Sequence, residues 1–177
     1  NVEIHMNDWK FCSPEVPVLY KREVSKEADE FQVQFGMREL HFDPLTKNAV
    51  LNCKPYFMRG SNVTLYRFFE DEVCKDLPWD SNWVRNLHKS FKIFHWNSLR
   101  YCICLPPEEW YRIADEDGFL IQAEFPIWYG GPGWSVWANE LKADELVKDY
   151  TTLIQAHGNL PSVVIGDSSN EPSCNVA

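Results

Sequence analysis

The first 42 residues alternate between apolar and polar side chains. The alternation is clearest in three short runs, at residues 16–20, 31–35 and 37–42. A period of two places every second side chain on one face, so these runs predict antiparallel strands with one buried face. The charged stretch at residues 21–30 is interpreted as a strand end and a turn. A short hairpin is expected next, with residues 49–51 and 56–58 on either side of a turn at residues 52–55.

From residue 56 onward, short apolar runs alternate with longer amphipathic stretches. Strands are predicted at residues 56–63, within 93–103, and at 119–125 and 162–165. Helices are predicted at residues 79–94, from 106 to a stop at Gly118, and at 143–156. The first of these helices carries a large apolar residue at every fourth position, at Trp79, Trp83, Leu87 and Phe91. Strands that alternate with helices predict a parallel sheet with right-handed crossovers.

This change of pattern divides the chain into two segments. An all-β segment covers residues 1–42, and a β/α segment covers residues 43–177. Three strands rarely close a sandwich, and four βα units leave both edges of a parallel sheet open. We therefore expect the chain to be the middle part of a longer protein.

The composition fits a folded chain without nucleic-acid or membrane partners. Apolar residues make up 45% of the 177 residues and charged residues 24%, so the chain can bury a sizeable core. The formal charge of −9 argues against a nucleic-acid partner, because such partners need a basic face. No apolar run reaches the roughly 18 residues that a membrane-spanning helix needs.

The six cysteines and five histidines do not form a pattern typical of a metal site. The cysteines are irregularly spaced and include no C-x-x-C pair, and the histidines do not cluster near them. We therefore expect no metal and no cofactor. Cysteine usage does not fix the cellular compartment, and a periplasmic or secreted location is favoured.

The carboxyl ends of the predicted parallel strands carry the candidate chemistry, because functional residues of β/α barrels lie there. The four ends are residues 59–62, 97–101, 122–129 and 167–171. Together they offer amides, one arginine near the second strand end, carboxylates and aromatic rings. Amides and carboxylates bind hydroxyl groups, aromatic faces stack on sugar rings, and a carboxyl group can protonate a glycosidic oxygen. This combination is typical of a carbohydrate site.

Several of the same segments resemble glycoside hydrolase family 2, the family of β-galactosidases, β-mannosidases and β-glucuronidases. The matching motifs are Asn52-x-Lys-Pro-Tyr-Phe-Met-Arg-Gly60, Asn97-Ser-Leu-Arg100, Trp110-Tyr111 with Ala114-Asp-Glu-Asp-Gly118, and Pro161-Ser-Val-Val-Ile165 through Asn170-Glu171. The resemblance implies an α/β fold. Residues 1–42 would be the C-terminal strands of an immunoglobulin-like β-sandwich domain. Residues 43–177 would be the N-terminal half of a (β/α)8 TIM barrel, which is the catalytic domain.

The resemblance also implies a mechanism: a retaining β-glycosidase with two carboxylates. Glu171 matches the general acid/base, and Asn170 the residue that binds the substrate 2-hydroxyl. Arg100 matches the arginine that keeps the nucleophile ionised. The family's nucleophile follows the seventh strand and would lie outside this chain. A complementary segment or chain would then supply the rest of the barrel, and the substrate would be a β-linked glycan.

Each site residue also has a plainer interpretation. Arg100 can simply pair with Glu124 or Asp167. Glu124 is expected to bind substrate hydroxyls, although a catalytic pair with Glu171 is a further possibility. Asn62 opens a glycosylation sequon, but its place on a strand favours an amide that faces the site.

Several residues around the candidate site differ from those usual in the family, or have a second interpretation. Trp128 is either a sugar platform or a packing residue of its loop. Gly166 and Ala123 stand where the family usually has an aromatic residue and a carboxylate, and Cys53 replaces the glycine of an Asn-Gly turn. These departures keep a second function open, namely an inactive carbohydrate-binding or interaction module with the same fold.

Overall fold

The computed structural model describes residues 5–26, 29–127 and 142–170. The strands are β1 (Tyr20–Lys26), β2 (Asp29–Phe35), β3 (Leu40–Phe42), β4 (Ala49–Leu51), β5 (Lys54–Pro55), β6 (Gly60–Thr64), β7 (Ser98–Cys102), β8 (Leu120–Glu124) and β9 (Val163–Asp167). The helices are α1 (Tyr66–Glu70), the 3-10 helix η1 (Leu77–Trp79), α2 (Ser81–Ile93), α3 (Glu108–Asp117) and α5 (Ala143–His157). Among the described residues, no helix is long and apolar enough to span a membrane.

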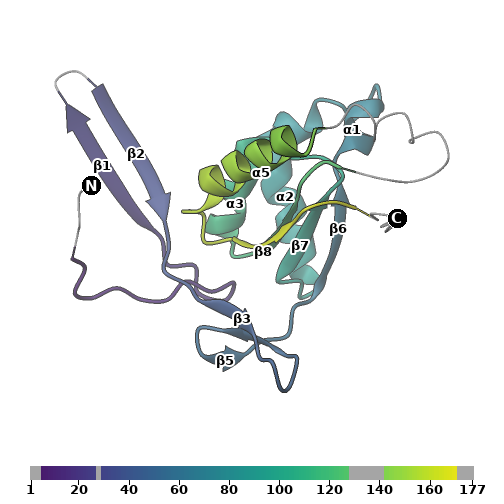
Figure 1. Ribbon diagram of the computed structural model, residues 1–177. Helices are drawn as coiled ribbons and strands as arrows, with labels where there is room; N and C mark the ends of the chain where they lie inside the picture. The colour runs from purple at the N-terminus through teal and green to yellow at the C-terminus, as the bar shows by residue number, and fades with distance from the viewer. Residues whose placement is uncertain (1–4, 27–28, 128–141, 171–177) are drawn as a thin grey trace.

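Strands β1 and β2 form an antiparallel hairpin that projects away from the rest of the molecule (Figure 1). The bounds predicted for the first strand are wrong: β1 begins at Tyr20 rather than at residue 16, and it continues through most of the charged stretch that was interpreted as a strand end and a turn. The two strands pair from Tyr20 opposite Phe35 to Lys26 opposite Asp29. The charged residues of this stretch do not interrupt the strand pattern. Charged side chains occupy both faces of β1: Lys21 and Glu23 lie on one face, whereas Arg22 shares the other with Val24.

Strands β3, β4 and β5 form a small antiparallel sheet below the parallel strands in Figure 1. The β4–β5 turn consists of Asn52 and Cys53, with φ values of 51° and 66°. Cys53 thus has the left-handed backbone that glycine ordinarily takes in an Asn-Gly turn. The Asn52 side chain fastens the turn, because its Oδ1 accepts from the Glu39 amide at 3.0 Å and its Nδ2 donates to the Cys12 carbonyl at 2.9 Å.

Strand β6 begins at Gly60, four residues later than predicted. The Asn97 side chain forms hydrogen bonds with the backbone groups that a longer strand would pair with its neighbour. Its Oδ1 accepts from the Arg59 amide at 2.7 Å, and its Nδ2 donates to the Phe57 carbonyl at 3.0 Å. The segment before Gly60 is therefore satisfied without a neighbouring strand.

Strands β6 to β9 form the predicted parallel sheet, in the order β6-β7-β8-β9. Helix α2 begins after Asp80, whose carboxylate caps the helix by accepting from the Asn82 amide at 2.8 Å. Helix α3 ends at Gly118 as predicted, with a left-handed φ of 74°. Glycine is required there because a Cβ would lie 2.3 Å from the Pro14 carbonyl oxygen.

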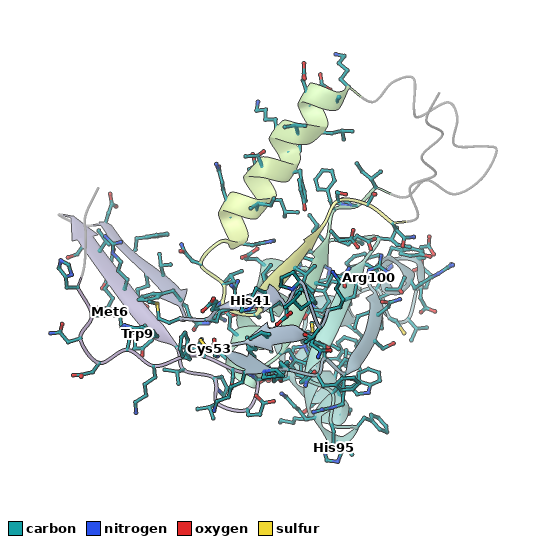
Figure 2. The ribbon with its side chains drawn as sticks, turned by 60° about the horizontal axis from the view of Figure 1, so that its bottom comes forward. Met6, Trp9, His41, Cys53, His95 and Arg100 are labelled. Carbon is teal, nitrogen blue, oxygen red and sulfur yellow. The ribbon has the colours of Figure 1, made fainter. Side chains whose placement is uncertain are left out.

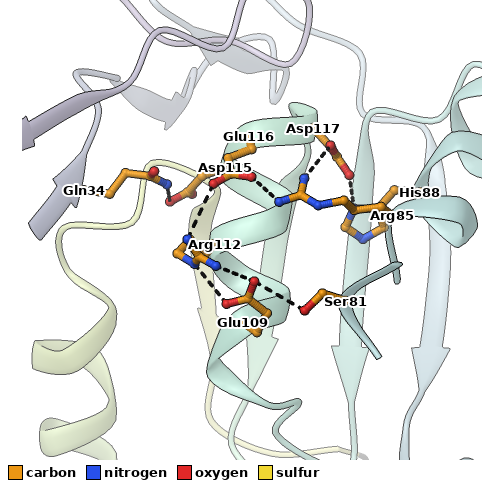
Figure 3. Close-up of polar contacts among 9 residues, drawn as sticks. All are labelled: Gln34, Ser81, Arg85, His88, Glu109, Arg112, Asp115, Glu116 and Asp117. Atoms are coloured by element: carbon orange, nitrogen blue, oxygen red, sulfur yellow. Dashed lines mark hydrogen bonds and ion pairs between the residues drawn. The ribbon is translucent and has the colours of Figure 1, made fainter. Parts of the chain in front are cut away.

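One face of this sheet packs against α2 and α3. The buried core on that side comprises Val63, Leu65, Val84, Leu99, Tyr101, Trp110, Tyr111, Ile113, Ala114, Phe119, Ile121 and Ala123. Ion pairs join the two helices beside this core, where Arg85 of α2 contacts Glu116 and Asp117 of α3 (Figure 3). Helices α2, α3 and α5 lie on the same side of the sheet in Figure 1. The described fold is thus a mixed α/β arrangement compatible with part of a TIM barrel.

Candidate functional site

The face of the parallel sheet that α2 and α3 leave uncovered carries a row of mostly polar side chains. Asn62 of β6 is in register with Arg100 of β7, which is in register with Gln122 of β8 and, beyond it, Ile165 of β9. These four residues line a cleft of about 320 Å³. We call this uncovered side of strands β6 to β9 the open face.

Arg100 joins the ends of the strands on the open face. Figure 2 shows it toward the opposite end of the sheet from His95, which precedes β7. Its Nη2 forms an ion pair with Glu124 of β8, donates to Asn170 Oδ1 at 3.0 Å and lies 3.5 Å from Asp167 Oδ2. One guanidinium nitrogen thus contacts acceptors from β8, from β9 and from the segment after β9.

Glu124 is fully buried, with 0% of its surface exposed. One carboxylate oxygen pairs with Arg100, and the other accepts from the backbone amide of Ile103 at 2.7 Å. Ile103 has a φ of 58°, a left-handed conformation that is unusual for a β-branched residue. This backbone turn directly after β7 directs the amide at Glu124. The carboxylate is therefore satisfied on both oxygens, as a buried charge must be.

Asp167 lies beside Glu124, which it faces in the register of β8 and β9. Its Oδ2 accepts from Gln122 Nε2 at 2.9 Å, and its backbone carbonyl accepts from the Phe125 amide at 2.7 Å. The Asn170 amide donates to the Ile127 carbonyl at 2.7 Å. These bonds hold the segments that follow β8 and β9 side by side, and they fix the position of Asn170.

The structure brings together three of the residues predicted for the site: Arg100, Glu124 and Asn170. The predicted pairing of Arg100 with Glu124 or Asp167 is confirmed, and Arg100 contacts both. Asn62 lies on the same face in the middle of β6 and is exposed. Glu171 and Trp128, the predicted acid/base and the candidate sugar platform, lie outside the described residues, so their roles stay predictions.

Gln122 and Asp167 belong to this cluster although neither was selected as a site residue. Both stand at predicted strand ends, and that position was the signal that could have identified them. What the sequence did not reveal is that Gln122 donates to Asp167 across the two strands. The side chain of Asp167 is 27% exposed, in contrast with the buried Glu124.

The cluster offers acid–base and hydrogen-bonding groups rather than a nucleophilic thiol. Burial raises the pKa of the Cys104 thiol, which lies two residues after β7, so this thiol stays protonated at neutral pH. No group of three histidine, cysteine or acidic side chains among the described residues could hold a metal ion. The buried Nε of Arg100 has no hydrogen-bond partner in the described part of the chain.

The fold is similar to that of bacterial β-glucuronidases. The solved structure of Bacteroides uniformis β-glucuronidase 3 matches 93% of this chain with a TM-score of 0.68 and 24% identity. Two further structures match with a TM-score of 0.72. The Ruminococcus gnavus β-glucuronidase, solved with a C6-substituted uronic isofagomine, is 23% identical over 93% of this chain. A β-glucuronidase from an uncultured Clostridium species is 22% identical over 94% of this chain.

This likeness is one of fold. The chain spans between 21% and 28% of the length of the three β-glucuronidases. No family model matches the sequence, and no curated protein matches it by sequence. The similar structures are glycoside hydrolases, which agrees with the fold expected from the family 2 resemblance.

Proposed function

We propose that this chain is part of a retaining β-glycosidase of glycoside hydrolase family 2 and acts on a β-linked glycan. The observation that carries the proposal is the cluster on the open face, where Arg100 meets Glu124, Asp167 and Asn170. Functional groups of β/α barrels gather at the carboxyl ends of their strands. The similarity to β-glucuronidases over 92–94% of the chain supports the same interpretation.

In this proposal Glu171 is the general acid/base. It protonates the leaving oxygen and then activates the water that releases the sugar. The neighbouring Asn170 binds the sugar 2-hydroxyl. Its Oδ1 accepts from Arg100 at 3.0 Å, which orients the amide so that its NH2 group can donate to a substrate oxygen.

Arg100 has two tasks in the proposed enzyme. It neutralises Glu124, and its guanidinium lies beside the nucleophilic carboxylate. A guanidinium beside a carboxylate stabilises the ionised form, which is the form that attacks the sugar. The nucleophile would follow the seventh barrel strand, on a complementary segment or chain that also supplies strands five to eight. Residues 1–42 would close an immunoglobulin-like domain, and residues 43–177 would begin the barrel.

An inactive carbohydrate-binding module is the second candidate. Gly166 favours it, because Tyr150 of α5 occupies the space beside this residue, with its hydroxyl 2.9 Å from where a Cβ would lie, so the larger residue usual in the family would not fit without a shift of Tyr150. The strand end that carries Asn170 therefore lacks the side chain of its own that would pack beneath it. With less support there, the site can bind a sugar and still fail to hold the catalytic groups in a productive geometry.

The test is hydrolysis of a panel of nitrophenyl β-glycosides. The 177-residue chain is assayed alone and together with a polypeptide that carries the remaining barrel strands. Glu171→Gln is the test variant, and Glu145→Gln on the exposed surface of α5 is the matched control. We expect turnover only in the combined sample, loss of at least a hundredfold in Glu171→Gln, and no change in Glu145→Gln.

Other outcomes distinguish the alternatives. Sugar binding without turnover in the combined sample would identify the inactive module. Turnover by the isolated chain that Glu171→Gln abolishes would mean that both carboxylates lie within these 177 residues. Turnover that survives Glu171→Gln would contradict the assignment of the acid/base.

A further inference from the structure

We infer that Asp167 is the carboxylate on the open face that meets the substrate, and that it makes this face select sugars without a carboxylate over uronic acids. The inference rests on the proposed function, because it concerns the sugar specificity of the same site. It assigns a substrate-selecting role to a residue that the family resemblance does not name.

Glu124, the other carboxylate of the cluster, cannot be the one that meets the substrate. Its side chain is completely buried, and both of its oxygens are already bonded, one to Arg100 and one to the Ile103 amide. Because none of its surface is exposed, a sugar hydroxyl could reach Glu124 only if the groups packed around it moved away. Glu124 therefore positions Arg100 and does not contact the ligand.

Asp167 has the opposite properties. Its side chain is 27% exposed, and Gln122 Nε2 holds its Oδ2 at 2.9 Å. Its Oδ1 makes no hydrogen bond to the residues that the structure describes. A fixed carboxylate with one available oxygen is a good acceptor for a sugar hydroxyl, because a bond to a charged acceptor is stronger than one to a neutral acceptor.

The same geometry opposes a negatively charged sugar. Within the described ranges, Arg100 is the one cationic side chain on the open face of strands β6 to β9. Its Nη2 is shared among Glu124, Asp167 and Asn170. Two carboxylates and one guanidinium leave the cluster with a net charge of −1. A uronate would meet this negative charge and an arginine that is already paired, and it would be repelled.

The test uses two ligands that share one cationic ring: isofagomine, and isofagomine with a carboxylate at C6. Their dissociation constants for the full 177-residue chain are measured by isothermal titration calorimetry. Because the ring charge is common to both, the ratio of the two constants isolates the effect of the carboxylate. We expect isofagomine to bind roughly tenfold more tightly.

The Asp167→Asn variant should reduce the preference for isofagomine over its carboxylated form, measured as the ratio of the two dissociation constants, roughly three- to tenfold. Asp167→Ser provides a second variant of the same position, and circular dichroism checks that each is folded. Asp149→Asn, which removes the same charge from the exposed surface of α5, should leave the ratio unchanged.

The other outcomes contradict either the selecting role of Asp167 or the sugar site itself. If the carboxylated ligand binds as tightly as isofagomine or more tightly, or if both Asp167 variants keep the ratio, the selecting role of Asp167 is wrong while the proposed carbohydrate site stands. If neither ligand binds to the folded chain, either alone or together with the polypeptide that carries the remaining barrel strands, the open face is not a sugar site, and the proposed function fails together with this inference.

Discussion

The two faces of strands β7 and β8 differ in kind although they come from the same ten residues. On the face toward α2 and α3, Leu99, Tyr101 and Ile121 are at most 2% exposed. On the open face, the alternate residues Arg100 and Gln122 are polar and partly exposed. Strands of parallel sheets are ordinarily apolar on both sides because both sides are covered. The polar open face is therefore the side to which we assign the proposed function, and the apolar face is the side that stabilises the fold.

The two faces should also respond differently to substitution. The helix-covered face is stabilised by the area that it buries and by aromatic packing, such as the edge-to-face contact of Tyr101 with Trp110 at 5.6 Å. The open face depends on the completeness of its charge pairing. Removal of one partner there leaves a buried charge without compensation.

The largest expected effect is the loss of Trp110 from the covered face. This side chain is 0% exposed, and its Nε1 donates to the Pro78 carbonyl at 2.7 Å. Trp110→Ala should lower the free energy of unfolding by about 3–5 kcal/mol, measured by urea denaturation. Trp79→Ala, at a tryptophan that is 68% exposed, should cost about 1 kcal/mol or less. Equal costs for the two variants would refute the assignment of the core.

The second effect concerns the open face. Arg100→Met should lower the free energy of unfolding by about 2–4 kcal/mol, because Glu124 stays buried without its cation. Adding Glu124→Gln in the same chain should recover at least half of the loss, since the uncompensated charge is then gone. Arg112→Met, which breaks a half-exposed pair with Glu109, should cost about 0–1 kcal/mol in the same urea titration. A double variant no more stable than Arg100→Met would contradict the pairing argument.

The smallest expected effect concerns Asp115, whose carboxylate is buried on the helix-covered side of the sheet. Asp115 of α3 accepts from the Ser162 amide at 2.8 Å and from Gln34 Nε2 at 3.3 Å (Figure 3 shows Gln34). Burial raises its pKa above the ordinary value of 3.8. The folded state thus holds this proton more tightly than the unfolded state does. The resulting stability is complete below the unfolded pKa and is lost as the pH rises through the folded pKa.

Asp115→Asn cannot titrate at this position and removes that pH dependence. We expect the free energy of unfolding of the natural chain, relative to Asp115→Asn, to fall as the pH rises from 4 to 7. Urea titrations at several pH values measure this difference. A difference that stays constant, or that grows with pH, would show that burial does not dominate the ionisation of Asp115.

Much of the parallel sheet could be predicted because its pattern is local. The four-residue spacing of large apolar side chains predicted α2, and Gly118 predicted the end of α3. The meeting of Arg100 with Glu124 and Asp167 followed from a rule about strand ends. None of these predictions needed a long-range contact to be known in advance.

The failures involve contacts between distant segments. The start of β6 depends on Asn97, which lies 38 positions from Arg59 and binds its backbone. The burial of Glu124 depends on the left-handed backbone at Ile103, which a β-branched residue does not signal. The antiparallel pairing of the first two strands was predicted, but the bounds of β1 were wrong, because the charged residues after Tyr20 were interpreted as a strand end and a turn although they continue the strand to Lys26.

The central claim is that the open face binds a sugar. The most direct measurement is a two-dimensional 15N–1H NMR titration of the full 177-residue chain with isofagomine. The account predicts that the Nε–H signal of Arg100 and the side-chain amide signals of Gln122 and Asn170 shift, while the indole signal of Trp110 on the covered face stays in place. Shifts confined to the covered face, or no shift at saturating ligand, would contradict it.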